Sequence, residues 1–214
     1  MKQSEILSDL KGVQHGFCNA IDSGTVCQPI LMNQVHSADA LFLTEPPVSP
    51  PMADAFITQT PNLCLTVKTA DCAPVLMADP TSGMVAAVHA GWRGAFQGIL
   101  ENTVLQMIRH GADPNTIYAA VGPHIQRNSF VAGTDMYTLF PKTEEHFFTR
   151  MEKNYLFDFD AYVIYRLRRA GVAHIGHIPD DTYTDSAYFS YRRDPANPGR
   201  QYSFIVIGEN YDNR

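Results

Sequence analysis

Residues that can bind a metal or transfer a proton follow three apolar runs of the sequence. His36 comes after PILMNQV, and His89 comes after MVAAV. Asp71 and Cys72 come after LCLTVKTA. Such runs are typical of strands, and ligand sites of sheet proteins often lie beyond strand ends. We therefore expect the three ends to converge, although 36 residues separate His36 from Cys72 and 17 separate Cys72 from His89.

The role of Cys72 is open on these grounds. It could be a buried thiol, half of a disulfide, a nucleophile or a metal ligand. Together with His36 and His89 it would form a tetrahedral zinc site with a fourth position open to water. The spacings match no local zinc motif, and a core histidine or a buried cysteine is the ordinary alternative. Asp71 could act as a base or could orient a histidine ligand.

The segment HAGWRGAFQGI suggests a second kind of chemistry. Gly91 and Gly94 bracket a turn into a helix, and Arg93 lies at its start. Backbone N–H groups at a helix start, together with an arginine, can bind an anion such as phosphate. The simpler interpretation is that the glycines only permit the turn.

Composition limits the classes of partner and compartment. The 214 residues carry a net charge of −6, which argues against nucleic acid as the main partner. We find no apolar signal-peptide core and no run of 18 apolar residues, so we expect neither export nor a membrane span. In an unexported protein the four cysteines, Cys18, Cys27, Cys64 and Cys72, are expected to be reduced thiols.

The remaining pattern predicts a mixed α/β domain. One helix is expected after Gly94, with apolar residues on one face up to Ile108 and a left-handed cap at Gly111, and another over 160–170. The proline-rich segments 45–51 and 194–200 are predicted loops. Many strands lie too close together for helical crossovers, so mixed sheets are expected. The predicted strands are 29–35, 55–58, 63–67, 73–78, 84–88, 116–121, 172–178 and 202–207.

The sequence resembles the laccase-domain family over roughly residues 30–207. The resemblance is carried by NQVHSADA, DAFIT, AAVGPHI, the long stretch LTVKTADCAPVLMADPTSGMVAAVHAGWRGAFQGI, and YFSYRRD followed by GRQ. The combination of TADC with HAGWRG is the most specific part. Members of this family are also called multicopper polyphenol oxidoreductases, purine nucleoside phosphorylases and peptidoglycan editing factors.

The resemblance implies a single domain, residues 1–214, folded as a layered α/β/β/α sandwich with mixed sheets. It implies a cytoplasmic monomer that binds zinc through His36, Cys72 and His89. The implied activities are phosphorolysis of purine nucleosides and deamination of adenosine. We expect Cys72 and Asp71 to be catalytic. The residues expected to bind the nucleoside or phosphate are Gln34, Arg93, Arg192 and Arg193.

Three departures from the family pattern accompany the resemblance. The region before about residue 30 is shorter than the family's by several tens of residues. Asp181 stands where the family has a cysteine, and Ser129 and Phe130 stand where a cysteine and a tyrosine are usual. The metal ligands are kept while part of the surrounding wall differs. Copper-dependent polyphenol oxidation, hydrolysis of a peptidoglycan precursor and a metal-bound module without activity are the alternatives.

Overall fold

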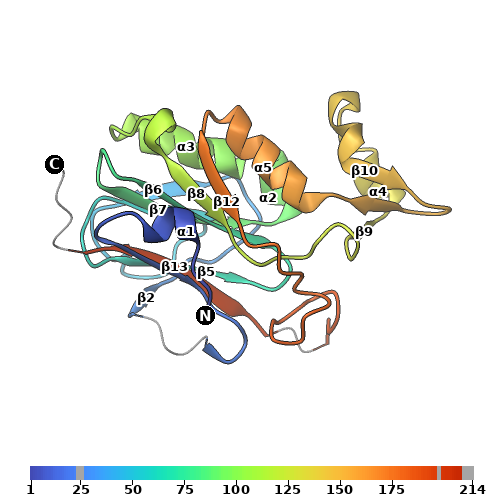
Figure 1. Cartoon of the computed structure of the whole chain (residues 1–214), viewed down its shortest axis with the longest axis horizontal. Coiled ribbons are helices and arrows are strands. Elements are labelled where there is room, and N and C mark those ends of the chain that lie inside the picture. Colours follow the sequence, from blue (N-terminus) through green and yellow to red (C-terminus); the bar gives the residue numbers. More distant parts are fainter. Residues whose placement is uncertain (23–26, 197–198, 209–214) are drawn as a thin grey trace.

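The protein is described by a computed structural model that covers residues 1–22, 27–196 and 199–208. Mixed and antiparallel sheets pack with helices in layers (Figure 1). This layered α/β arrangement confirms the expected fold class. In this part of the chain, no helix is long and apolar enough to cross a membrane.

The largest sheet has six strands in the order β12-β8-β6-β7-β4-β3. Its centre is antiparallel, while β3–β4 and β12–β8 at its two edges are parallel pairs. The central strands β6 and β7 are buried along their whole length. The strands are β3 (Ala40–Leu43), β4 (Ala55–Thr58), β6 (Ala73–Asp79), β7 (Met84–Ala90), β8 (Tyr118–Val121) and β12 (His174–His177).

A four-stranded sheet in the order β1-β13-β5-β2 packs against this large sheet. It is antiparallel except for the short parallel pair β2–β5. Helix α1 (Glu5–Ser8) contacts β1 of this sheet and β8 and β12 of the large one, so it lies where the two sheets meet. The strands are β1 (Val13–Phe17), β2 (Pro29–Ile30), β5 (Cys64–Thr69) and β13 (Gln201–Ile207).

A small antiparallel sheet, ordered β10-β11-β9, lies at one end of the molecule together with α4 (Figure 1, right). Its strands and the neighbouring short helices carry a dense group of aromatic rings. The elements are β9 (Val131–Ala132), α4 (Thr134–Tyr137), the 3-10 helix η3 (Lys142–Phe147), β10 (Phe148–Arg150) and β11 (Tyr155–Phe157). A further 3-10 helix, η2 (Pro114–Thr116), precedes β8.

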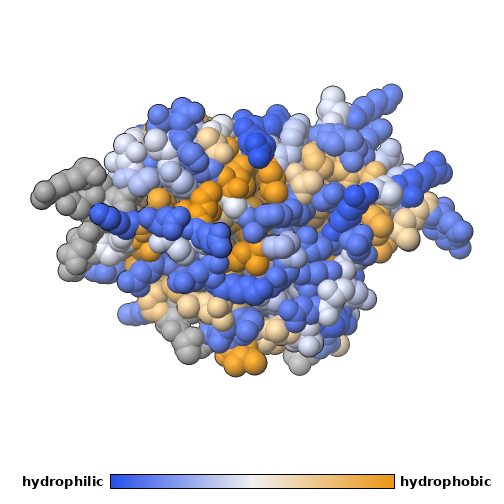
Figure 2. Space-filling model, viewed as in Figure 1, coloured by the Kyte–Doolittle hydropathy of each residue, from blue (hydrophilic) through white to orange (hydrophobic). Residues whose placement is uncertain are grey.

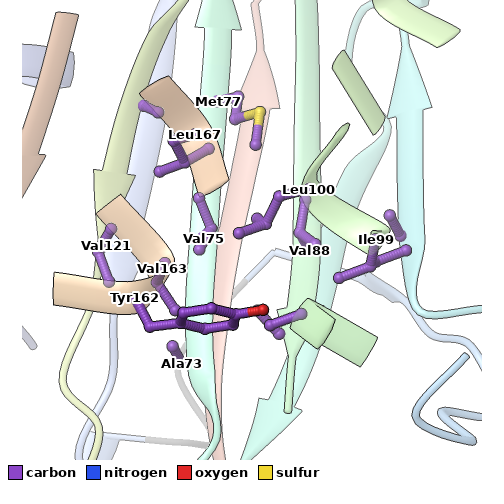
Figure 3. Close-up of a cluster of buried hydrophobic side chains, with 14 of the residues drawn as sticks. Ala73, Val75, Met77, Val88, Ile99, Leu100, Val121, Tyr162, Val163 and Leu167 are labelled. Carbon is purple, nitrogen blue, oxygen red and sulfur yellow. The ribbon is translucent and has the colours of Figure 1, made fainter. Parts of the chain in front are cut away.

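The large sheet is buried on both faces, which explains its continuous apolar runs. Side chains alternate along β6, so Val75 and Met77 face the helices while Leu76 faces the four-stranded sheet. Helices α2 (Trp92–Gln97), α3 (Ile99–Arg109) and α5 (Phe159–Arg169) contribute to the core on the helical face. Figure 3 shows residues of α3 and α5 packed over β6, β7 and β8.

Figure 2 shows a surface that is mostly hydrophilic in one view, with hydrophobic residues exposed near its middle.

The helix expected after Gly94 is divided in two. Gly98 has φ of +103°, which a residue with a Cβ adopts only with strain, and it ends α2 and precedes α3. The expected cap at Gly111 is confirmed, with φ also +103°. The helix predicted over 160–170 is α5, and the loop over 45–51 is confirmed. The loop over 194–200 is confirmed except for 197–198, which lie outside the described residues.

The expectation that all four cysteines are free is wrong for two of them. Cys27 and Cys64 form a disulfide, with Cα atoms 6.2 Å apart. Cys18 and Cys72 are free. Sequence spacing does not show which cysteines meet, because β2 and β5 bring two distant segments together.

Candidate metal centre

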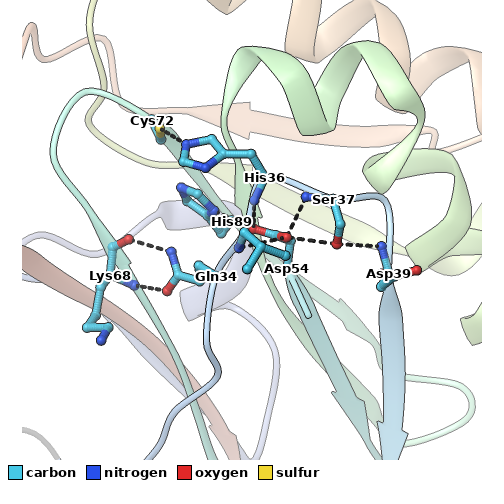
Figure 4. A network of polar contacts seen from close by, with 9 residues as sticks. Gln34, His36, Ser37, Asp39, Asp54, Lys68, Cys72 and His89 are labelled. Carbon is cyan, nitrogen blue, oxygen red and sulfur yellow. Dashed lines mark hydrogen bonds and ion pairs between the residues drawn. The ribbon is translucent and has the colours of Figure 1, made fainter. Parts of the chain in front are cut away.

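The side chains of His36, Cys72 and His89 converge as the sequence predicted. Their ligand atoms lie within 4.8 Å of one another, and Cys72 Sγ is 3.7 Å from His36 Nε2. Figure 4 shows the two imidazoles and the thiol on the same side of the sheet. His89 is buried, Cys72 is half-buried and His36 is exposed, so the cluster opens to solvent on the His36 side.

The local positions of the ligands differ from the strand ends expected. His36 follows a loop rather than a strand, because β2 ends at Ile30, and its φ is +60°. Cys72 lies in the tight turn between β5 and β6, next to Asp71 with φ of +82°. His89 lies inside β7, opposite Pro74 of β6.

Asp54, just before β4, connects two of the ligands. Its buried carboxylate accepts hydrogen bonds from His89 Nδ1 at 2.7 Å and from the backbone N–H of His36 at 3.1 Å. It also accepts from the backbone N–H groups of Val35 and Ser37 and from the Ser37 hydroxyl. Since His89 donates through Nδ1, its Nε2 is left to bind a metal.

The electrostatics of the cluster favour a thiolate. Burial would raise the pKa of Cys72, but the neighbouring His89 and His36 outweigh it and lower the pKa to about 6. Burial would also raise the pKa of Asp54, yet hydrogen bonds from His89 and Ser37 lower it to about 2. Burial lowers the pKa of His89, whereas Cys72 and Asp54 together raise it to about 9. Thiolate and imidazole are the ligand types that zinc prefers, so the donor set fits that metal.

Gly91 makes the close approach of the ligands possible. A Cβ at this position would lie 2.4 Å from His36 Cδ2 and 3.2 Å from Cys72 Sγ. Gly91 precedes α2, which begins at Trp92 and is only six residues long. The glycine of HAGWRG therefore leaves room for a ligand side chain.

The cluster lies on the wall of a cavity of about 710 Å³. One part of the lining is apolar, formed by Ile125 and the buried rings of Phe130 and Phe159. The lining also contains four basic residues, Lys68, Arg93, Arg192 and Arg200. A cavity with a metal-binding cluster, aromatic rings and cations can hold a planar base together with an anion.

The residues expected to bind phosphate are only partly brought together. Arg93 and Arg192 line the cavity, the first stacked on the Trp92 ring at 4.3 Å and the second 5.5 Å from the Phe130 ring. The cavity lining does not include Arg193. The Arg193 guanidinium donates to backbone carbonyls of residues 182, 183, 185 and 188, which makes it a structural brace for that loop.

Gln34 and Asp71 line the cavity but are occupied by other contacts. The Gln34 amide donates to Lys68 O at 2.7 Å and accepts from Lys68 N at 2.8 Å. The Asp71 carboxylate accepts from the Thr182 hydroxyl at 2.8 Å and from Arg192 N at 2.7 Å. Neither of these hydrogen bonds involves a histidine, and the carboxylate that accepts a hydrogen bond from a histidine of the cluster is that of Asp54.

Ser129 and Asp181, two of the three positions that depart from the family pattern, contact one another. The Ser129 hydroxyl donates to the Asp181 carboxylate at 2.5 Å. Asp181 also accepts from the backbone N–H groups of Gln126 and Tyr183. Serine and aspartate thus form a polar link next to Phe130 of the cavity wall.

Sequence reasoning missed Asp54, Lys68 and Arg200. The DAFIT motif contains Asp54 directly before an apolar strand, where a charged residue must be paired to be buried. The position of Asp54 directly before this strand is the feature of the sequence that could have identified it as a functional residue. Lys68 and Arg200 lie in the LTVKTADC and GRQ segments, and Arg200 belongs to an arginine-rich region that could bind an anion, but their place in the cavity depends on how β5 and β13 pair.

The sequence of this chain is similar to those of known proteins. A protein named purine nucleoside phosphorylase in Rickettsia prowazekii is 36% identical over 199 residues, covering 90% of this chain and 79% of the relative. In Escherichia coli, purine nucleoside phosphorylase YfiH is 38% identical over 185 residues, covering 84% and 74%.

Solved structures show the same fold. A Neisseria meningitidis protein of a family of unknown function superposes with a TM-score of 0.78 at 32% identity, covering 88% of this chain and 78% of the other. A Bacillus licheniformis protein named YfiH superposes with a TM-score of 0.83 at 24% identity, covering 94% of each chain, which supports the fold alone. The sequence model for multi-copper polyphenol oxidoreductase laccase matches residues 13–208, and the chain therefore belongs to that family.

Proposed function

We propose that this protein is a zinc-dependent enzyme that cleaves purine nucleosides with phosphate and also deaminates adenosine. The main support is that the His36, Cys72 and His89 cluster opens into a cavity with both an aromatic wall and basic side chains. The curated relatives that carry the name purine nucleoside phosphorylase agree with this reaction class.

The chain's residues have distinct parts in phosphorolysis. Ile125, Phe130 and Phe159 form the apolar part of the wall against which the purine would lie, and Arg93 and Arg192, with Lys68 and Arg200, attract phosphate. A phosphate oxygen attacks C1′ of the ribose while the bond to the purine nitrogen breaks. The departing base takes the bonding electrons and is then protonated by the proton of the attacking hydrogen phosphate, directly or through water.

In deamination, a water oxygen adds at C6 of adenine and the amino group leaves as ammonia. When bound at His36, Cys72 and His89, zinc supplies Lewis acidity and brings the pKa of water toward neutrality. Asp54 keeps His89 in the correct tautomer for binding the metal. Asp71 lines the same cavity and is the candidate base, although its carboxylate already accepts two hydrogen bonds.

Copper-dependent polyphenol oxidation is the less supported activity. Multicopper chemistry needs several coppers with many imidazole or sulfur ligands. Within residues 1–22, 27–196 and 199–208, His36, Cys72 and His89 form the one cluster of metal-binding type. One cluster favours a single metal ion in each chain.

The test measures bound metal and product together. Protein containing one zinc per chain is incubated with inosine or adenosine, with and without phosphate. We expect free purine base only with phosphate, and ammonia from adenosine in both cases. Cys72→Ala should abolish turnover, whereas Cys18→Ala removes the other free thiol and should retain it. Zinc-loaded protein without turnover, or protein with several coppers that oxidises polyphenols, would contradict the proposal.

A further inference from the structure

Each pair of candidate ligands is held together by a different link. Cys72 is placed beside His89 by the β6–β7 ladder, in which Ala73 pairs with Ala90 and Pro74 with His89. His36 is placed beside His89 by Asp54, which accepts a hydrogen bond from each of them. Both links are buried and rest on the large sheet.

His36 and Cys72 are linked through the two segments that precede them. The short strand β2 pairs in parallel with β5 at Pro29–Ile30. Further along, Gln34 holds both the N–H and the carbonyl of Lys68 with its side-chain amide. Figure 4 shows this double hydrogen bond next to the three candidate ligands.

The Cys27–Cys64 disulfide joins the same two segments at the end farther from the candidate ligands. Its partners are 37 residues apart, compared with 34 for Gln34 and Lys68 and 36 for His36 and Cys72. A nearly constant offset means that the two segments run alongside each other from the disulfide to the ligands. We define this pair of segments, residues 27–36 and 64–72, as the ligand brace.

Few other contacts join the two segments of the ligand brace to each other, although Asn33 within the first segment also exchanges backbone hydrogen bonds with Pro51 and Ala53. β2 has only two residues, so it contributes little ladder pairing. A covalent cross-link restricts how far the two segments can separate. Cys64 is buried, but Cys27 is exposed, so a reductant can reach the bond from the Cys27 side.

We propose that the Cys27–Cys64 disulfide and Gln34 are positioning elements of the metal centre, and that reducing the disulfide weakens metal binding. A dithiol supplies two electrons and two protons: the bond between the two cysteines breaks, two thiols form, and the dithiol becomes a disulfide. The inference concerns metal affinity and does not depend on which reaction the centre catalyses.

The first experiment compares two single cysteine variants of the full chain. Cys27→Ala changes an exposed side chain and removes the disulfide. Cys18→Ala is the matched control, because Cys18 packs in the same small cluster as Cys64 but is free. The dissociation constant for Zn²⁺ is measured by competition with a chromogenic chelator. We expect roughly tenfold weaker binding for Cys27→Ala, as for other residues that support a ligand, and less than about a twofold change for Cys18→Ala.

Two further measurements separate positioning from loss of folding. The parent protein is reduced with an immobilised dithiol, measured, and then reoxidised; its zinc affinity should fall and return, while Cys27→Ala should not respond. Absorption of bound Co²⁺ reports whether thiolate and imidazole still coordinate together.

Gln34→Met, which removes both hydrogen bonds to the Lys68 backbone, should also weaken zinc binding. Unchanged affinity after reduction and in Cys27→Ala would overturn the proposal. Because no substrate is present, that result is distinct from a failure of nucleoside turnover.

Discussion

At the level of single residues, Asp54 joins two of the three candidate ligands of the metal centre. One buried carboxylate accepts from the His89 ring, the His36 backbone, the Val35 backbone and two groups of Ser37. It thereby sets the ring orientation of one ligand and the backbone position of another. Asp71, the carboxylate beside Cys72 in the sequence, instead holds the loop that carries Thr182 and Arg192.

This difference predicts that two matched substitutions will change zinc affinity to different extents. Asp54→Asn removes the charge that accepts the His89 proton, and we expect zinc affinity to fall by about 10- to 100-fold. Asp71→Asn should leave zinc affinity within about threefold and act on substrate kinetics. Chelator competition gives the affinities, and thermal unfolding confirms that both variants are folded. Equal losses of zinc in the two variants would show that Asp54 has no special part.

At the scale of elements, apolar periodicity predicted the buried face of α3 but not its beginning. Ile99, Leu100, Val104 and Met107 are buried against the large sheet as expected, whereas Ile108, expected on the same face, is 39% exposed. The break at Gly98 was not foreseen, because a glycine within a periodic pattern is compatible with a continuous helix. Strands 55–58, 73–78 and 202–207 were located within a residue, since each is a short, mostly apolar run rich in branched or aromatic residues.

Two leucines on α3 test this assignment of faces. Leu100 is fully buried in the core between the helices and the large sheet, whereas Leu105 is 44% exposed. Leu100→Ala should lower the free energy of unfolding by about 2–5 kcal/mol through lost burial and the cavity left behind. Leu105→Ala should change it by less than about 0.5 kcal/mol. Urea unfolding of both variants gives these values, and comparable losses would mean that the helix presents a different face to the sheet.

At the scale of the whole molecule, the first residues of the chain connect the two large sheets. α1 contacts both, and Ser4 just before it donates its backbone N–H to His15 Nε2 at 2.9 Å in β1. His15 is buried, and burial lowers its pKa below the ordinary 6.5. The folded protein therefore holds His15 neutral where the unfolded chain would take up a proton.

Stability should consequently decrease in mild acid. Well above pH 6.5 neither state protonates His15 and its contribution is fully present. As the pH falls from 6.5 toward the lower folded-state pKa, the unfolded chain binds more protons, and the free energy of unfolding drops by at most about 1.4 kcal/mol per pH unit. Urea unfolding of metal-free protein at several pH values should show a shallower loss for His15→Gln, which keeps a hydrogen-bond acceptor. A parent and a variant with identical pH profiles would contradict this account.

The amino-acid sequence was enough to predict the layered α/β class, the main strands and helices, the proline-rich loops, and the candidate ligands His36, Cys72 and His89. These features arise from patterns between neighbouring residues and from a motif that resembles a known family. The folded structure was needed to show that Asp54 accepts a hydrogen bond from His89, that Cys27 pairs with Cys64, that Arg193 binds backbone carbonyls, and that Lys68 and Arg200 line the cavity. These contacts join residues far apart in the chain, and their partners are set by strand pairing and packing rather than by any local pattern.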